Sequence, residues 1–370
     1  MTKASGLAEL HGGEVEWAIS QKYNIPISSI TSFASTVSPI IPESVRRLAD
    51  KFDQLYLYPA REAGKLKEIL AKHEGVEGKD RLILGCGSTE LIYLFAQVIC
   101  NGEVIVPIPT YSEYESAIKR YGGTPVFLDL GPSFDLDVSK IKSAIGPRTR
   151  AIFVCNPNNP TGRLYPKRDL EELVKLAKQK NIVLFVDEDY LCFAPASKKY
   201  SMTEYVDSYP VFVVNSLSKL FGVPSIRLGW GVGSKSLIEK LSAHKLPWMI
   251  SNLAIWAGEE LLMDASYQQR ITNLITGQRK ELYNQLREID WLHVYPSDCN
   301  FFLLKITAPN LSSTAVFEKL VEDRLVVRDC SSIRGLGNKF LRTTIRTPEE
   351  NQLLIRGMQN VLVKPLAVQP

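Results

Sequence analysis

Polar residues follow three short apolar runs of this chain, and their types could do covalent chemistry. Asn159 follows the run AIFVC, Asp187 and Tyr190 follow IVLFV, and Lys219 follows VFVVN. If these runs are neighbouring parallel strands, their carboxyl ends meet at one sheet edge, where α/β proteins bind ligands. A lysine amine there can bond to a carbonyl carbon, and a buried carboxylate can pair with a cationic ring nitrogen. The pattern predicts a ligand site around Lys219 and Asp187.

A second set of residues could hold a phosphate. Ser88 and Thr89 lie in LILGCGSTE, where a strand, a glycine turn and a helix start follow one another. Helix N-termini bind anions through their free backbone N–H groups. Ser216, Ser218 and Arg227, in NSLSKLFGVPSIRLGW, add two hydroxyls and a guanidinium. We expect these residues to form an anion cradle close to Lys219.

These residue types meet the requirements of pyridoxal 5′-phosphate. Lys219 would be its attachment point, Asp187 the partner of its pyridine nitrogen, and Asn159 and Tyr190 the donors to its phenolic oxygen. Tyr111, in PTYSEY, could stack on the ring. Taken alone, each residue has an ordinary explanation, such as a surface lysine or a helix-capping aspartate. The combination on one sheet edge indicates the cofactor, with Lys219, Asp187 and Tyr190 as the catalytic candidates.

The elements that must position these residues are strands buried on both faces. Continuous apolar runs of that kind are RLILG, EVIVPI, AIFVC, IVLFV and VFVVN. The amphipathic pattern DLEELVKLAKQK predicts a helix between two of them, and such alternation predicts a mostly parallel sheet with right-handed crossovers. The tail differs, because the strand-like LVVRD and FLRTTIR precede a helix with capping-box residues Thr347 and Glu350. We therefore expect a large α/β domain at 46–265 and a smaller α+β domain from 1–45 and 266–370.

Composition narrows the class of partner. The chain has 370 residues and a net charge of only +4, so a nucleic-acid partner is not expected. Its six cysteines form no CxxC pair, which argues against a metal site and against disulfides. The start MTKASGLAEL lacks a signal core, and the longest apolar stretch, LIYLFAQVIC, is too short to span a membrane. We expect a cytoplasmic protein without membrane partners.

The segments NPNNPTG, DEDY and SLSKLFGVPSIRLGW resemble the class I and II aminotransferase superfamily of fold-type I pyridoxal-phosphate enzymes. The similarity extends over nearly the whole chain. It implies a mostly parallel seven-stranded sheet in the large domain, a smaller domain, and a homodimer with shared active sites. It also implies that Tyr58 reaches the cofactor phosphate of the partner subunit, whereas Tyr58 taken alone could simply pack beside Pro59.

Four arginines near the C-terminus bear on the substrate. By its position in the family, Arg342 in FLRTTIR would bind an α-carboxylate bidentately, with two parallel N–H···O hydrogen bonds. Arg328 in VVRDC lies where the histidinol-phosphate branch of the family has an arginine for the substrate phosphate. We interpret Arg346 as a solvated surface charge, and the role of Arg334 stays open.

The segment LHGGEVEWAISQKYNI resembles the threonine-phosphate decarboxylase branch, as do LPWMISNLAIWAGEELL and VRDCSSIRGLG. On that resemblance, His11 and Gly12 would help to hold the substrate phosphate. The family has an asparagine at the position of Thr36, so the substrate side chain, threonine phosphate or serine phosphate, is open; Thr36 and Asn159 would face it. The implied reaction is decarboxylation of L-threonine-O-3-phosphate to (R)-1-amino-2-propanol phosphate in cobalamin biosynthesis, or of L-serine phosphate to ethanolamine phosphate.

Two alternatives remain. A histidinol-phosphate-type aminotransferase using 2-oxoglutarate would need the same scaffold, because only the bond broken at Cα differs. A cofactor-sensing regulator on this fold is the non-enzymatic alternative. Such regulators carry an additional winged-helix domain, for which we expect no room in this chain.

Overall fold

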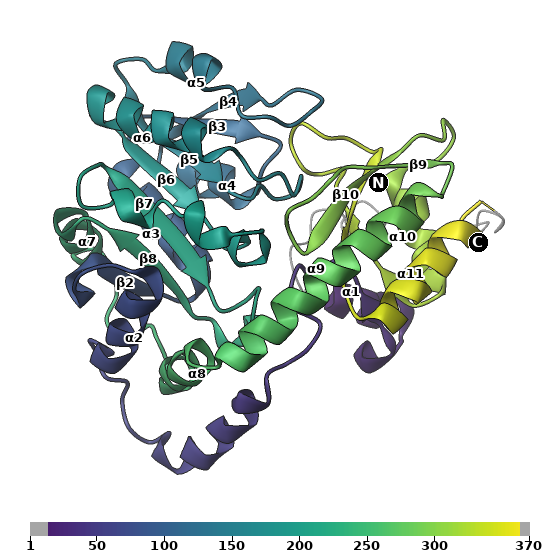
Figure 1. The fold of residues 1–370 in the computed structure, drawn as a ribbon, viewed down its shortest axis with the longest axis horizontal. Helices are drawn as coiled ribbons and strands as arrows, with labels where there is room; N and C mark the ends of the chain where they lie inside the picture. The colour runs from purple at the N-terminus through teal and green to yellow at the C-terminus, as the bar shows by residue number, and fades with distance from the viewer. Residues whose placement is uncertain (1–13, 363–370) are drawn as a thin grey trace.

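A computed structural model describes residues 14–362, which surround a large seven-stranded sheet (Figure 1). The strand order is β2-β8-β7-β6-β5-β3-β4. Only β8 runs antiparallel to its neighbours β2 and β7; the other pairs are parallel, so the predicted fold class is confirmed. The strands are β2 (Leu82–Gly85), β3 (Glu103–Ile108), β4 (Thr124–Asp129), β5 (Thr149–Cys155), β6 (Val183–Asp187), β7 (Val211–Ser216) and β8 (Gly229–Gly233).

Helices cover both faces of this sheet. They are α2 (Gly64–Glu74), α3 (Gly87–Ile99), α4 (Glu113–Arg120), α5 (Val138–Ala144), α6 (Lys167–Lys180), α7 (Lys235–Ser242) and α8 (Asn252–Leu262). On one face, Phe95 of α3 packs with Phe185 and Phe212 at ring-centroid distances of 5.1 and 5.5 Å. On the other face, the predicted amphipathic helix is present as α6, with Leu170 and Leu173 fully buried. The apolar strand runs are therefore covered on both sides, as their composition predicts.

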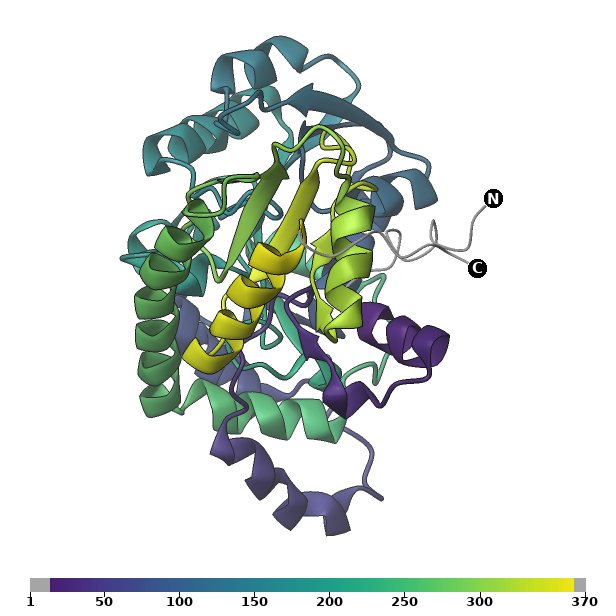
Figure 2. The same cartoon turned by 90° about the vertical axis from the view of Figure 1, so that its right-hand side faces the viewer.

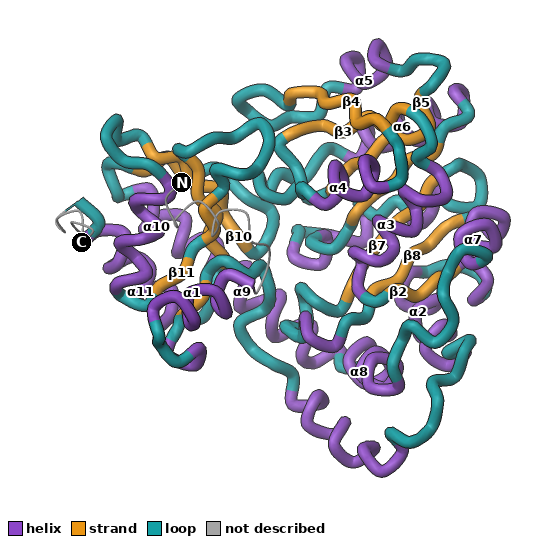
Figure 3. Tube along the Cα trace, turned by 180° about the vertical axis from the view of Figure 1, so that it is seen from behind, coloured by secondary structure: helices purple, strands orange, loops and turns teal. Residues whose placement is uncertain are grey.

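A second, four-stranded sheet lies to one side of the first, in the order β12-β13-β10-β9. Figures 1 and 3 show this smaller sheet with α1, α10 and α11 beside the large sheet, and Figure 2 looks onto α9 and α11. Its elements are α1 (Glu14–Tyr23), α9 (Ala265–Arg287), β9 (Leu292–Val294), β10 (Phe301–Ile306), α10 (Ser313–Glu322), β12 (Arg328–Asp329), β13 (Phe340–Thr344) and α11 (Pro348–Asn360). A two-stranded pair joins β1 (Thr31–Ser32) to β11 (Leu325–Val326). The N-terminal segment thus packs with the C-terminal third, while the exact domain boundaries stay a prediction.

Short 3₁₀ helices complete the chain. They are η2 (Ile27–Ser29), η3 (Glu43–Gln54), η4 (Lys79–Arg81), η5 (Leu191–Phe193), η6 (Ser197–Lys199), η7 (Thr203–Tyr205) and η8 (Pro224–Ile226). The predicted capping box of α11 is present: Thr347 Oγ1 accepts from the Glu350 backbone N–H, and Glu350 accepts from the Thr347 backbone N–H. None of the helices within residues 14–362 is long and apolar enough to cross a membrane.

Candidate active site

The ends of three adjacent strands bring the predicted residues together. Asp187 ends β6 and pairs in register with Cys155 of β5 on one side and Val214 of β7 on the other. Asn159 follows β5, and Lys219 follows β7. The Nζ of Lys219 lies 5.4 Å from the centre of the Tyr190 ring. The carboxyl ends of the parallel strands therefore form one site, as the sequence pattern predicts.

Asp187 is a buried carboxyl, with 5% of its surface exposed. Its Oδ2 accepts a hydrogen bond from the Tyr114 hydroxyl at 2.7 Å, and its Oδ1 accepts from the Asp189 backbone N–H at 3.1 Å. Burial raises the pKa of Asp187 to about 7, and the nearby charge of Asp189 acts in the same direction. A cationic ring nitrogen would reverse much of this shift, because an opposite charge favours the ionised carboxylate.

The donors predicted for a phenolic oxygen are held by the smaller sheet and the N-terminal segment. Tyr190 forms a 2.7 Å hydrogen bond with the Thr36 hydroxyl, and its ring packs edge-on against Phe301 at 5.0 Å. The Oδ1 of Asn159 accepts from Arg342 at 2.6 Å, which leaves the amide N–H₂ of Asn159 as its donor. Both side chains are thereby fixed in position before any ligand binds.

The predicted anion cradle lies at the start of α3. Gly87, the first residue of α3, has φ +76°, and a Cβ at this position would lie 2.3 Å from the Arg227 guanidinium. Arg227 also donates to the Cys86 carbonyl at 3.2 Å, so its positive charge lies against the helix N-terminus. The Ser88 hydroxyl donates to Asp189 at 2.8 Å, so Ser88 offers an anion its backbone N–H. Across the site, Ser216 accepts from the Ser218 backbone N–H at 3.2 Å. A helix N-terminus, an arginine and small hydroxyl residues fit a phosphate.

Tyr111 and Thr89 lie at the same edge. Burial raises the pKa of the Tyr111 hydroxyl, while a hydrogen bond with Thr89 and the charge of Lys219 lower it. Tyr111 also packs edge-on against Tyr114 at a centroid distance of 5.6 Å. The ring of Tyr111 is therefore half-buried close to Lys219, where it could stack on a planar ligand.

Arg328 and Arg342 form a buried pair on the smaller sheet. They are register partners across β12 and β13 and are 5% and 7% exposed. Arg342 donates to the Ala34 carbonyl at 2.8 Å as well as to Asn159, and Arg328 donates to Ser332 at 3.4 Å. Arg342 Nε and Arg328 Nη1 are buried and have no hydrogen-bond partner among residues 14–362. Buried cations with spare donors favour anionic groups of a substrate.

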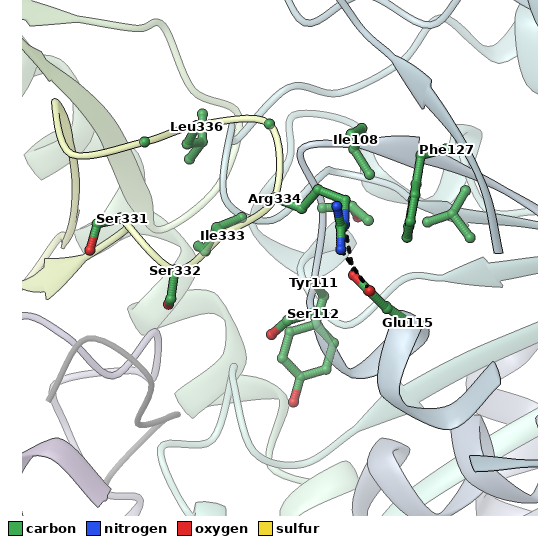
Figure 4. A pocket seen from close by; sticks show the side chains of 14 residues that line it. Ile108, Tyr111, Ser112, Glu115, Phe127, Ser331, Ser332, Ile333, Arg334 and Leu336 are labelled. Atoms are coloured by element: carbon green, nitrogen blue, oxygen red, sulfur yellow. Dashed lines mark hydrogen bonds and ion pairs between the residues drawn. The ribbon is translucent and has the colours of Figure 1, made fainter. Parts of the chain in front are cut away.

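Arg334, whose role the sequence leaves open, connects the loop after β12 to α4. It donates to both carboxylate oxygens of Glu115 at 2.9 and 2.8 Å, and its guanidinium lies 4.4 Å from the Phe127 ring centre. These hydrogen bonds hold the pKa of Glu115 at about 2. Figure 4 shows this pair in a pocket of about 630 Å³ between the start of α4 and the 331–337 loop, with Tyr111 also in its lining. Lys219 and Asp187 do not line this pocket.

The interpretation of Arg346 as a solvated surface charge is wrong. Only 17% of its side chain is exposed, and it pairs with Glu350 at 2.7 Å. Its guanidinium also lies over the Phe33 ring, at 5.9 Å from the centre. The reason is the tight connection from β13 to α11, which places the Glu350 carboxylate of the capping box next to Arg346.

Two residues of the site are absent from the sequence-based prediction. Tyr114 holds Asp187 from the first turn of α4, three residues after Tyr111; this helical spacing beside an aromatic residue was the available signal. Asp189 bonds to Ser88, and the signal was a second acid within DEDY. In contrast, His11 and Gly12 lie outside the described residues. Tyr58 is 83% exposed and contacts Trp248 at a centroid distance of 5.8 Å.

Comparison with known proteins identifies the family. The profile of aminotransferase class I and II matches residues 31–357. The chain belongs to this family. Class I and II aminotransferases are pyridoxal-phosphate enzymes, so the predicted cofactor is confirmed at the level of the family.

Individual aminotransferase-family relatives differ in reaction. The chain is 34% identical to a putative threonine-phosphate decarboxylase of Caldanaerobacter subterraneus subsp. tengcongensis, over 88% of this chain and 89% of that protein. It is 33% identical to a histidinol-phosphate aminotransferase of Methanosarcina mazei, over 92% of this chain and 90% of that protein. The solved histidinol-phosphate aminotransferase of Sinorhizobium meliloti in complex with pyridoxal-5′-phosphate has the same fold, with a TM-score of 0.84, 20% identity and 98% of each chain covered. The chain is therefore similar to both reaction classes.

Proposed function

We propose that this enzyme decarboxylates a phosphorylated amino acid, with L-threonine-O-3-phosphate as the first candidate and L-serine phosphate as the second. The relative at 34% identity is a putative threonine-phosphate decarboxylase. The product would be (R)-1-amino-2-propanol phosphate, or ethanolamine phosphate from serine phosphate, and cobalamin biosynthesis is the corresponding pathway.

The observation that supports this substrate class best is the buried pair of Arg328 and Arg342. The two residues are opposite one another on β12 and β13, and each has a buried N–H group without a protein partner among residues 14–362. An amino-acid phosphate carries two anionic groups, a carboxylate and a phosphate, which match two guanidinium groups. Arg342, fixed by Asn159, would bind the α-carboxylate, and Arg328 would bind the phosphate.

The remaining residues serve the cofactor. Lys219 would attach it, Asp187 would keep its ring nitrogen protonated, and Asn159 with Tyr190 would bond its phenolic oxygen. The cradle of Ser88, Thr89, Ser216, Ser218 and Arg227 would hold its phosphate, and Tyr111 would stack on its ring. When bound, pyridoxal phosphate supplies a protonated ring that accepts the electron pair of a bond broken at the substrate Cα.

The choice of bond depends on how the substrate is held. Two anchoring arginines would fix the rotation about the substrate Cα and so decide which of its bonds is aligned for cleavage. A decarboxylase places the carboxylate there, whereas an aminotransferase places the hydrogen there. In both reactions the Lys219 amine would be the group that moves a proton at the substrate Cα.

The alternative is a histidinol-phosphate-type aminotransferase, which the 33% identical relative supports. The two reactions differ in their need for a second substrate. The holoenzyme with threonine phosphate, serine phosphate or histidinol phosphate should be assayed for CO₂ release and for glutamate formation from 2-oxoglutarate. Decarboxylation predicts CO₂ from threonine phosphate or serine phosphate without an oxo-acid. Turnover that strictly requires 2-oxoglutarate would refute the proposal in favour of the aminotransferase.

We also infer that the enzyme is a homodimer with shared active sites. Large apolar side chains are exposed along the segment 52–58, which begins in the last turn of η3; η3 projects at the bottom of Figure 1. Tyr56 and Tyr58 are 82% and 83% exposed, and the segment is anchored by Asn252, which donates to the Leu57 carbonyl at 2.8 Å. Trp248, 55% exposed, extends the same apolar surface. Exposed aromatic surface of this kind marks an interface, and Tyr58 would reach the partner's cofactor phosphate.

Analytical ultracentrifugation tests the dimer directly. We expect the sedimentation of a dimer at micromolar concentration, and a lower cofactor affinity in Tyr58→Phe without loss of the dimer. Tyr23→Phe on α1, where the exposed ring lies outside this surface, is the control. A stable monomer that binds the cofactor as tightly as a dimer would contradict the proposal.

A further inference from the structure

Asp189 is a second buried carboxyl at the cofactor site. It is 7% exposed and follows the end of β6 by two residues. Its Oδ2 accepts the Ser88 hydroxyl at 2.8 Å, and its backbone N–H donates to Asp187 Oδ1 at 3.1 Å. Its Oδ1 is buried and has no hydrogen-bond partner among the residues that the structure describes.

The position of Asp189 spans the two ends of the cofactor site. Ser88 lies in the first turn of α3, where a phosphate is expected, and Asp187 lies where a pyridine nitrogen is expected. Because Asp189 is bonded to both Ser88 and Asp187, it is adjacent to a cofactor that extends from one to the other. A purely structural carboxylate would have both oxygens bonded, because an unpaired buried oxygen is costly. The unpaired Oδ1 therefore indicates a ligand partner.

Charged and titratable groups surround Asp189 on each neighbouring element. The groups whose pKa its charge affects are Asp187, Tyr190, Cys155 and Cys192. The cations of the site are Lys219, Arg227 and Arg342, which lie beside Tyr190, Gly87 and Asn159. Within residues 14–362, the Asp189 carboxylate bonds to the Ser88 hydroxyl and forms no ion pair.

We propose that Asp189 is a positioning residue for the cofactor: its carboxylate adds a second negative charge beside the bound pyridoxal phosphate and favours the protonated state of the nitrogen that joins Lys219 to it. The carboxylate acts by its charge and by holding Ser88 at the cradle. It forms no covalent bond and transfers no proton. The inference rests on the cofactor and not on the choice between decarboxylation and transamination.

The sign of the effect follows from electrostatics. A nearby negative charge stabilises a cation, so it raises the pKa of the protonated nitrogen. Replacing Asp189 by asparagine keeps the size and a hydrogen-bond acceptor for Ser88 but removes the charge. The pH at which the visible absorbance of the bound cofactor changes should then move down by about one unit.

The test is an absorbance titration of the holoenzyme without substrate, with the cofactor dissociation constant measured alongside. Asp189→Asn should lower the midpoint, and Asp189→Glu, which keeps the charge, should return it toward the wild-type value. Ser88→Ala separates the hydrogen bond from the charge and should shift the midpoint less than Asp189→Asn. Glu188→Gln is the matched control on the preceding residue, because the Glu188 carboxyl bonds to Ser201 and Met202.

The titration is done without substrate, so its result does not depend on whether the enzyme is a decarboxylase or an aminotransferase. A midpoint and dissociation constant in Asp189→Asn equal to wild type would overturn the inference. If Asp189→Asn binds no cofactor, Asp189→Glu decides: restored binding supports the role of the charge, and continued loss overturns it.

Discussion

At the scale of single residues, Asn159 connects the cofactor part of the site to the substrate part. Its Oδ1 holds Arg342, and Arg342 in turn donates to the Ala34 carbonyl of the N-terminal segment. The guanidinium is therefore fixed from both sides before a substrate arrives. Preorganised donors of this kind lose little freedom on binding, which favours a defined orientation of the carboxylate.

Replacing Lys219 tests the attachment point. Lys219→Ala should lose the visible absorbance of the covalently bound cofactor, because no other amine lies at the ends of β5, β6 and β7 within the described residues. Absorbance spectra after cofactor addition and desalting measure this. Lys175→Ala, on the exposed face of α6, is the control and should keep the wild-type spectrum. An unchanged spectrum in Lys219→Ala would refute the site assignment.

Removing the Tyr114 hydroxyl should make cofactor binding depend more strongly on pH. Burial raises the pKa of Asp187 to about 7, and the hydrogen bond from Tyr114 opposes this rise. In Tyr114→Phe the pKa of Asp187 therefore increases further, and fewer molecules hold the ionised carboxylate that a cationic ring needs. We expect about tenfold weaker binding below pH ~7 and a small difference at pH ~9.

Equilibrium dialysis across this pH range measures the effect. Tyr121→Phe, a partly exposed tyrosine at the end of α4, serves as the control and should follow the wild-type profile. A loss of affinity in Tyr114→Phe that is the same at all pH values would show that Tyr114 acts by packing and not through Asp187.

At the scale of elements, the strands that end in site residues are predictable and β8 is not. β5, β6 and β7 are continuous apolar runs, and burial on both faces requires that composition. β8 has the sequence GWGVG, with few β-forming side chains. A Cβ at Gly229 would lie 2.5 Å from the backbone of Gly87 and Ser88, so glycine lets this strand approach the cradle. That requirement comes from tertiary contact and leaves no periodic signal.

The same distinction applies to the arginines. Position in the family singled out Arg328 and Arg342, but no local pattern distinguishes them from Arg346 and Arg334. Burial of the first pair depends on the register of β12 with β13, and the partners of the other two come from α11 and α4. Burial of a cation is decided by elements far apart in the sequence, so only the structure could assign it.

The pairing of β12 and β13 leads to a test of the two arginines. Arg328→Gln should raise the KM for a phosphorylated amino acid by about 10- to 100-fold, the range for losing a charged hydrogen bond, with a smaller change for the unphosphorylated amino acid. Arg342→Gln should impair both substrates, because both carry the α-carboxylate. Steady-state kinetics with threonine phosphate and threonine measure the difference. Equal effects of Arg328→Gln on the two substrates would contradict a phosphate role.

The capping box of α11 permits a stability test outside the active site. Thr347→Ala removes the hydroxyl that accepts from the Glu350 backbone N–H, and N-cap losses of this kind cost about 1 kcal/mol. Thr347→Ser keeps the cap and should remain close to wild type. Urea unfolding of the three proteins measures the free energy of unfolding. Equal stability of the alanine and serine variants would show that the packing of α11 alone fixes this end.

At the scale of the whole molecule, buried acids lie on both sides of the end of β6. Asp187 faces the site, whereas Glu188 is 2% exposed and accepts from the Ser201 hydroxyl and the Met202 backbone N–H at 2.8 and 2.7 Å. Glu74, at the end of α2, accepts from the Trp230 indole at 2.7 Å. These contacts join α2, β6, β8 and the 201–202 turn, so the protonation of Glu188 and Glu74 affects how several elements pack.

The stability of the enzyme should therefore fall as pH rises through the neutral range. Burial raises the pKa of Glu188 to about 8 and that of Glu74 to about 7, from an ordinary value of 4.5. Between the unfolded and folded pKa values, the folded state keeps protons that the unfolded state has lost. The free energy of unfolding decreases over that interval and levels off above it.

Glu188→Gln stays neutral at every pH and keeps groups that can bond Ser201 and Met202. It should exceed wild type by several kcal/mol at pH ~9 and by less than about 1 kcal/mol at pH ~5. Urea unfolding at several pH values measures this, and parallel pH curves for the two proteins would contradict a buried, protonated Glu188.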